Sequence, residues 1–159
     1  MAKLPKPKLL VVAILLCEGA GIIGSFFTTP AIASWYPTLQ KPFFSPPNWL
    51  FAPVWSLLFL LMGVALYLVW RQKNGQPAVA KALKVFGFQL FLNVLWSVFF
   101  FGLRDPAAAL MEIILLWGMI VYTIVLFAKV DKKAAWLLYP YLAWVSFAGL
   151  LNLAFWRLN

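Results

Sequence analysis

Five apolar segments, each about as long as a membrane-spanning helix, dominate this chain of 159 residues. They cover residues 9–27, 50–70, 85–103, 107–128 and 134–156. With 65% hydrophobic and only 11% charged residues, the chain has too few polar side chains to cover a water-soluble domain. The segments lack the polar and apolar alternation of barrel strands. The sequence therefore predicts an all-α integral membrane protein, a single domain over residues 1–159 that forms a bundle of five transmembrane helices.

The charges indicate how this bundle is oriented. Thirteen Lys and Arg stand against four Asp and Glu, for a net charge of +9. Most cations lie in the N-terminal tail, the second loop and the fourth loop: Lys3, Lys6, Lys8, Arg71, Lys73, Lys81, Lys84, Lys129, Lys132 and Lys133. Lys41, Arg104 and Arg157 fall on the opposite side. The positive-inside rule then predicts a cytoplasmic N-terminus. Because topology explains the charge, we expect no nucleic-acid partner.

The first segment resembles a secretory signal peptide, since three lysines precede an apolar run. The run is long, however, and Trp35 and Tyr36 follow it. We interpret it as a retained membrane span.

Residue types exclude most catalytic chemistry. The chain has no histidine and a single cysteine, Cys17, which removes imidazole bases, Cys/His metal sites and an intramolecular disulfide. No glycine-rich phosphate loop is present. We therefore predict no metal site, no required cofactor and no certain catalytic residue.

Two carboxyl groups lie within predicted spans, each alone on its span. A carboxylate inside a membrane is costly, so a functional role is the default interpretation for Glu18, beside that of a neutral acid bonded to a neighbouring helix. Glu112 is near enough to Pro106 to reach the interface, which favours a structural role.

A loop at 28–49 joins the first two spans. It contains Pro30, Pro37, Pro42, Pro46 and Pro47, which stiffen it. Its aromatic residues are Trp35, Tyr36, Phe43, Phe44 and Trp49. These features predict either a lid folded over the mouth of the bundle or an aromatic belt at the membrane interface, and both interpretations stay open.

Polar and aromatic residues share one face of two spans. In the third span, residues at i, i+4, i+7 and i+11 are Gln89, Asn93, Trp96 and Phe100. In the fifth span, residues at i, i+3, i+7 and i+11 are Tyr141, Trp144, Ala148 and Asn152, with Pro140 loosening the first turn. Such stripes suit a flat, partly polar ligand, and they equally suit hydrogen bonds between helices.

Small residues recur four apart in the first span. The pairs are Cys17 with Gly21, Ala20 with Gly24, and Gly21 with Ser25. This pattern favours close helix packing, either within the chain or between subunits.

Three ordered blocks resemble the TspO or translocator protein family, also called tryptophan-rich sensory proteins or peripheral benzodiazepine receptors. The first block comprises Trp35, Tyr36, Leu39, Lys41, Pro42, Pro46, Pro47, Trp49, Pro53, Val54 and Trp55. The second comprises Gln89, Leu90, Leu92, Asn93, Trp96, Ser97, Phe99 and Phe100. The third comprises Pro140, Tyr141, Leu142, Trp144, Phe147, Ala148, Leu151, Asn152 and Trp156. The resemblance covers nearly the whole chain.

This resemblance implies a five-helix bundle, usually a homodimer, with a pocket under the first loop that binds porphyrins such as protoporphyrin IX and drug-like apolar ligands. By matching position, the pocket residues are Tyr36, Trp55, Asn93, Trp96, Trp144 and Ala148. The stripes add Gln89 and Tyr141. For some bacterial members the family also implies light-dependent porphyrin breakdown, with Trp55 and Trp144 as the photochemical candidates.

The expected function is thus a membrane receptor for porphyrins, with Asn93 and Gln89 bonding the polar edge of the ligand and Lys41 or Arg104 meeting a propionate. The alternatives are a transporter of tetrapyrroles or other apolar metabolites, and a ligand-responsive regulator of a partner protein. A prokaryotic cell membrane is favoured over the mitochondrial outer membrane.

Three departures from the family matter. Many relatives carry Trp where this chain has Phe44, and animal members carry Trp near Ala108. The animal sterol-recognition stretch needs Tyr at the position of Leu153, which disfavours sterol binding through the C-terminal end.

Overall fold

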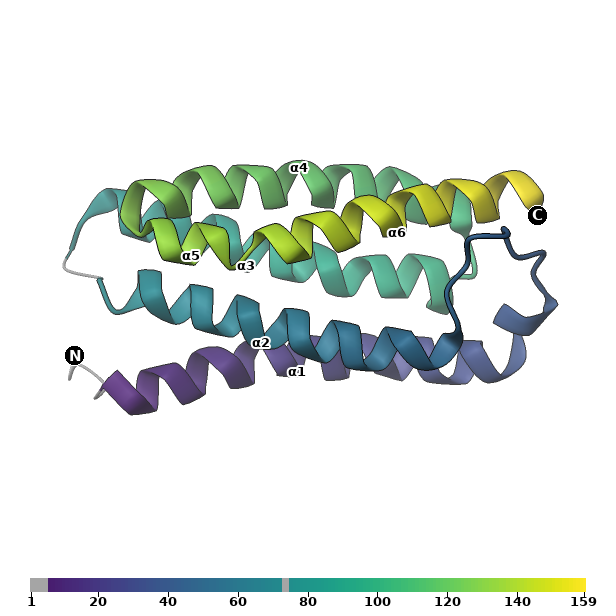
Figure 1. The fold of residues 1–159 in the computed structure, drawn as a ribbon, viewed down its shortest axis with the longest axis horizontal. Helices are drawn as coiled ribbons and strands as arrows, with labels where there is room; N and C mark the ends of the chain where they lie inside the picture. The colour runs from purple at the N-terminus through teal and green to yellow at the C-terminus, as the bar shows by residue number, and fades with distance from the viewer. Residues whose placement is uncertain (1–5, 73–74) are drawn as a thin grey trace.

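The computed structural model describes residues 6–72 and 75–159 and shows a bundle of long helices (Figure 1). Its elements in chain order are α1 (Lys6–Ser34), η1 (Tyr36–Thr38), η2 (Asn48–Leu50), α2 (Phe51–Trp70), α3 (Pro77–Ser97), η3 (Val98–Gly102), α4 (Pro106–Val130), α5 (Lys132–Trp136) and α6 (Tyr139–Leu158). Within the described ranges, five helical units are long and apolar enough to cross a membrane, and none of the elements is a strand. The predicted all-α, five-helix membrane bundle is confirmed.

The helices are arranged so that α1 and α2 run together along one edge of the bundle and α4 and α6 along the other, with α3 packed on both α1 and α4 (Figure 1). One end of the bundle holds the start of α1, the end of α2, the start of α3 and the junction of α4 with α5. The α1–α2 loop, the turn before α4 and the C-terminus lie at the other end. The described cation-rich segments therefore gather at one end, as the charge pattern predicts. Lys3 and Lys73 lie outside the described residues.

The first helix is longer than its apolar segment. The prediction that it ends at Phe27 was wrong, because α1 continues to Ser34 and takes residues 28–34 out of the predicted loop. Pro30 lies inside this helix, and the Ser34 hydroxyl donates to the Pro30 carbonyl at 2.8 Å. A proline removes only one backbone hydrogen bond, and the helix tolerates that loss near its end.

Two other helix boundaries also differ from the prediction. The third helix begins at Pro77 rather than at residue 85, because Lys81 and Lys84 interrupt its apolar residues and a hydropathy profile finds only the uninterrupted part. Proline suits this position, where the N–H group would have no partner within the helix. The predicted fifth span is two helices, interrupted at Leu137 and Leu138, so Pro140 occupies the first turn of α6.

Glycines allow α1 to pack closely against its neighbours. A Cβ atom on Gly63 of α2 would lie 2.6 Å from the Ile14 Cα of α1. One on Gly21 would lie 2.6 Å from the Phe59 ring, and one on Gly24 would lie 3.2 Å from the Ser97 hydroxyl. The small residues of α1 at Gly21 and Gly24 thus pack within the chain, which is one of the two alternatives that the sequence left open.

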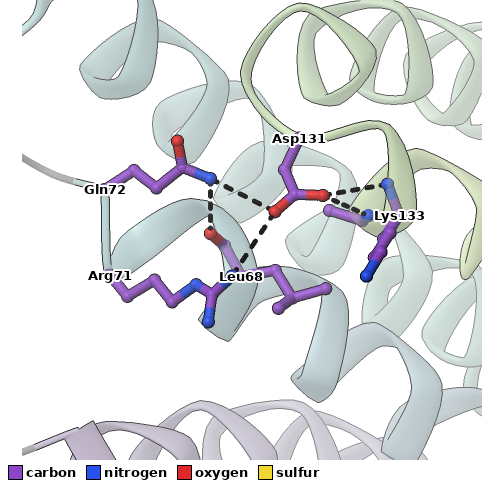
Figure 2. A network of polar contacts seen from close by, with 6 residues as sticks. Leu68, Arg71, Gln72, Asp131 and Lys133 are labelled. Atoms are coloured by element: carbon purple, nitrogen blue, oxygen red, sulfur yellow. Dashed lines mark hydrogen bonds and ion pairs between the residues drawn. The ribbon is translucent and has the colours of Figure 1, made fainter.

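Asp131 ties three helices together at the cation-rich end (Figure 2). Its Oδ1 atom accepts the backbone N–H groups of Lys133 at 2.9 Å and Ala134 at 3.4 Å, which caps α5. Its Oδ2 atom accepts from the Gln72 side-chain amide at 3.2 Å and lies 3.7 Å from an Arg71 guanidinium nitrogen. One carboxylate therefore joins the end of α2 to the junction between α4 and α5.

Replacing Asp131 by alanine should lower the stability of the bundle by about 1–2 kcal/mol. The variant removes the N-cap of α5 and the contacts of Asp131 with the end of α2. Asp131→Asn keeps a capping oxygen but has an amide nitrogen in place of Oδ2, so it loses the hydrogen bond from Gln72 and the ion pair with half-exposed Arg71, each worth about 1 kcal/mol or less. Thermal unfolding in detergent micelles measures both variants. Equal midpoints for the two variants would contradict the capping role.

Candidate functional site

A cavity lies between α1, α2, α3 and α6, under the α1–α2 loop. Its volume is about 230 Å³, and its mouth is open. Of the residues predicted to bind a ligand, six line it: Tyr36, Trp55, Asn93, Trp96, Trp144 and Ala148. The structure therefore brings residues from three separate sequence blocks to one cavity.

Aromatic rings form much of the cavity wall and pack on one another. The Trp55 ring stacks on Phe59 with centroids 5.5 Å apart, and the Trp96 ring stacks on Phe100 at 5.1 Å. Trp144 meets Phe51 edge to face at 6.1 Å. Rings held in this way offer flat apolar surfaces to a planar ligand at little cost in side-chain entropy.

Gln89 and Tyr141, the other two predicted binding residues, lie behind the wall. Neither lines the cavity, and each is only 1% exposed. The Tyr141 hydroxyl donates to the Gln89 side-chain oxygen at 2.9 Å and accepts from the Asn93 amide at 2.9 Å. These bonds fix α3 to α6 and hold Asn93 at the cavity surface.

A second set of hydrogen bonds centres on Asn152, which was not among the predicted binding residues. The Trp96 indole N–H donates to the Asn152 side-chain oxygen at 3.0 Å, and the Asn152 amide donates to the Pro106 carbonyl at 2.7 Å. Asn152 itself lines the cavity. The stripe on the fifth span included Asn152, so its helical spacing was the signal for this role.

Two hydrogen-bond donors at the cavity remain unused. The Trp144 indole nitrogen and the Tyr36 hydroxyl are buried without a partner among the described residues. Burial raises the pKa of the Tyr36 phenol, and the nearby Ser45 hydroxyl offsets part of that rise. The phenol therefore keeps its proton at neutral pH. A ligand atom that reached either group would satisfy a donor that has no partner in the described part of the protein.

The first half of the α1–α2 loop packs on the bundle. Tyr36 packs on Phe155 at 5.3 Å, and the Lys41 ammonium lies 4.7 Å from the centre of the Tyr36 ring. The Gln40 backbone exchanges two hydrogen bonds with the Asn159 side chain, at 2.9 and 3.2 Å. Phe43, by contrast, is fully exposed. Part of the loop thus packs on the bundle beside the cavity and part of it is exposed, and the lid and belt interpretations both stay predictions.

One wall of the cavity was not predicted from the sequence. It is formed by α1, through Ala20, Gly21, Gly24, Ser25 and Thr28. These residues have small side chains, so the cavity extends close to the backbone of α1. The repeat of small residues in α1 was the only signal, and the sequence analysis connected it with helix packing alone.

The remaining polar candidates lie elsewhere. Arg104 is exposed with a φ of 56°, and neither it nor Lys41 lines the cavity. Glu18 is partly exposed on α1. Glu112 does not reach the interface as predicted, because its side chain is 6% exposed and both of its oxygens are buried without a partner among the described residues. The face of α4 that carries Glu112 also carries Ala109 and Leu116, which are buried, so the side chain points into the bundle.

The comparisons with known proteins agree with this fold. Residues 13–157 match the model of the TspO/MBR family. The tryptophan-rich protein TspO of Archaeoglobus fulgidus is 46% identical, over 94% of this chain and 96% of its own length. The protein of the same name from Chlorobaculum tepidum is 48% identical, over 94% and 95%. The translocator protein of Bos taurus is 40% identical, over 91% and 86%. The resemblance inferred from the three sequence blocks is confirmed, and the chain belongs to the TspO/MBR family of integral membrane proteins.

Proposed function

We propose that this protein is a membrane receptor that binds porphyrins such as protoporphyrin IX, and related apolar ligands, in the cavity under the α1–α2 loop. The observation that carries this proposal is the joint presence of Trp55, Trp96 and Trp144 around one cavity. A planar macrocycle can stack on indole faces from several sides, whereas a flexible ligand gains less from such walls.

The polar groups of the cavity support a ligand with an acidic edge. The unused donors of Trp144 and Tyr36 would bond a carboxylate or carbonyl of the ligand. Lys41 lies beside Tyr36 at the loop end, where a propionate would keep contact with water. A charged group placed there avoids the desolvation cost that it would meet deeper in the bundle.

The names of the relatives cover both sensing and transport. Among them are translocator proteins and a tryptophan-rich sensory protein of Cereibacter sphaeroides. Both roles require the ligand to be bound first. Ligand binding in the cavity is therefore the step to test.

We expect protoporphyrin IX to quench the tryptophan fluorescence of the detergent-purified protein in the dark, with saturation. Trp144→Phe removes an indole face and a donor, and should weaken binding about tenfold. Trp136 is 71% exposed on α5 and does not line the cavity, so Trp136→Phe is the matched control and should bind as wild type. Quenching that rises linearly without saturation would overturn the proposal.

The same samples under light address the photochemical interpretation. If Trp55 and Trp144 take part in porphyrin breakdown, the porphyrin spectrum should decay faster with wild type than with the double variant Trp55→Phe, Trp144→Phe. If the porphyrin spectrum decays at the same rate in both proteins at equal porphyrin occupancy, the two indoles take no part in the breakdown. The proposal would then be limited to porphyrin binding.

A further inference from the structure

A second hollow lies on the outer surface of the bundle, apart from the ligand cavity. It has a volume of about 460 Å³ and is bounded by Leu16 of α1, Leu66 and Trp70 of α2, and Lys84, Gly87 and Leu90 of α3. None of these residues lines the ligand cavity. We call this hollow the α1–α3 groove.

The length of the groove matches one leaflet of a bilayer. Its lining on α3 runs from Ala80 to Leu90, which at the rise of an α-helix is about 15 Å. The hydrocarbon core of a bilayer is about 30 Å thick, so one leaflet has about this depth. Leu16 and Gly87 are exposed, so the groove opens toward the surrounding lipid. A groove of this kind fits one extended acyl chain.

Charge is confined to one part of the groove. Among the described residues that line it, Lys84 is the only charged one, and it is exposed. It lies within the first eight residues of α3, and Trp70 is the last residue of α2, so both are near the cation-rich end of the bundle. Trp70 is an aromatic residue of the kind that marks membrane interfaces. Lys81, one turn away, is held over the Tyr122 ring at 5.6 Å. A long lysine side chain at this depth extends its ammonium group to the level of the lipid headgroups.

We propose that the α1–α3 groove binds one anionic phospholipid of the surrounding leaflet, with an acyl chain along α3 and the phosphate at Lys84. The apolar walls bind the chain, and the single cation selects the charge of the headgroup. The proposal is independent of the porphyrin function, because the two sites share no residue.

Gly87 provides a direct way to close the groove. A Cβ atom on Gly87 would meet nothing within 4 Å, so a larger side chain there begins in open space beside the groove. Gly118 of α4 is exposed in the same way and lies outside the groove. Gly87→Leu and Gly118→Leu are therefore matched variants, and both replace a helical glycine by a good helix former.

The test uses the protein reconstituted in vesicles that contain dibrominated phosphatidylglycerol or dibrominated phosphatidylcholine. Bromine on an acyl chain quenches nearby tryptophan, and the difference between wild type and Trp70→Phe isolates the signal of Trp70. At equal mole fraction, we expect the affinity of the groove for the anionic lipid to be about fivefold its affinity for the neutral lipid. One lysine near the membrane surface attracts an anionic headgroup with about this strength.

The variants separate the two parts of the proposal. Lys84→Gln should reduce quenching by the anionic lipid to the level of the neutral one, and Gly87→Leu should reduce quenching by both. Gly118→Leu and Lys132→Gln should leave both unchanged. Equal quenching by the two lipids in wild type, or no change with Gly87→Leu, would overturn the proposal.

Discussion

Replacing Ala148 by phenylalanine is expected to lower porphyrin affinity at least about tenfold while the bundle stays folded. Ala148 lines the cavity one helical turn from Trp144 and from Asn152, and its methyl side chain leaves room in front of the aromatic walls. A phenyl ring at this position would occupy the space proposed for the macrocycle. Because the cavity is open within the bundle, the ring enters space that no core residue fills.

Ala143→Phe is the matched control for this variant. Ala143 lies on the same helix, is exposed and does not line the cavity, so its phenyl ring would face lipid. We expect the control to bind protoporphyrin IX with wild-type affinity in the fluorescence titration. If Ala148→Phe retains wild-type affinity as well, the ligand does not lie in this cavity.

Replacing Gly63 by leucine should destabilise the bundle by about 3 kcal/mol or more. A side chain at Gly63 would begin 2.6 Å from the Ile14 Cα, which is a backbone atom that cannot rotate away. The variant can fold only if α1 and α2 move apart, and they would then lose their closest contact. Since α1 also forms a wall of the cavity, the same movement should weaken ligand binding.

Gly19→Leu is the control for the crossing of α1 and α2. A Cβ atom at Gly19 would have nothing within 4 Å, so this variant should be as stable as wild type or more stable, because glycine disfavours helices. Thermal unfolding in detergent measures both variants. Similar losses in the two would indicate that glycine itself, and not the close crossing, is what the bundle needs.

The existence of the helices was predictable, and their ends were not. Hydropathy finds the segments that must lie in lipid, which is why all five spans were predicted. It misses helical turns that carry charges, such as the first turns of α3 with Lys81 and Lys84. Proline also has two outcomes near a helix end: Pro30 lies inside α1, whereas Pro140 follows the interruption between α5 and α6.

The site was predictable in part, for a similar reason. Helical spacing places Asn93, Trp96, Trp144 and Ala148 on faces that meet, and all four line the cavity. The same spacing cannot tell which residues of a stripe reach the cavity and which support it, so Gln89 and Tyr141 were grouped with them. That distinction depends on how deep each side chain lies between two helices.

The turn at η3 could not be read from the sequence at all. It is a π-helical turn in which the Leu103 N–H donates to the Val98 carbonyl at 2.7 Å. The extra residue in this turn shifts the register of the helix, and Phe100 and Phe101 both reach the cavity. A periodicity of 3.6 residues carries no sign of such a shift.

The most direct test of the porphyrin site is an experimental structure of the protein with protoporphyrin IX bound. We expect a macrocycle between the rings of Trp55, Trp96 and Trp144, with a polar atom of the ligand within hydrogen-bonding distance of the Trp144 indole nitrogen or the Tyr36 hydroxyl. A macrocycle on the outer surface of the bundle, with this cavity left unchanged, would contradict it.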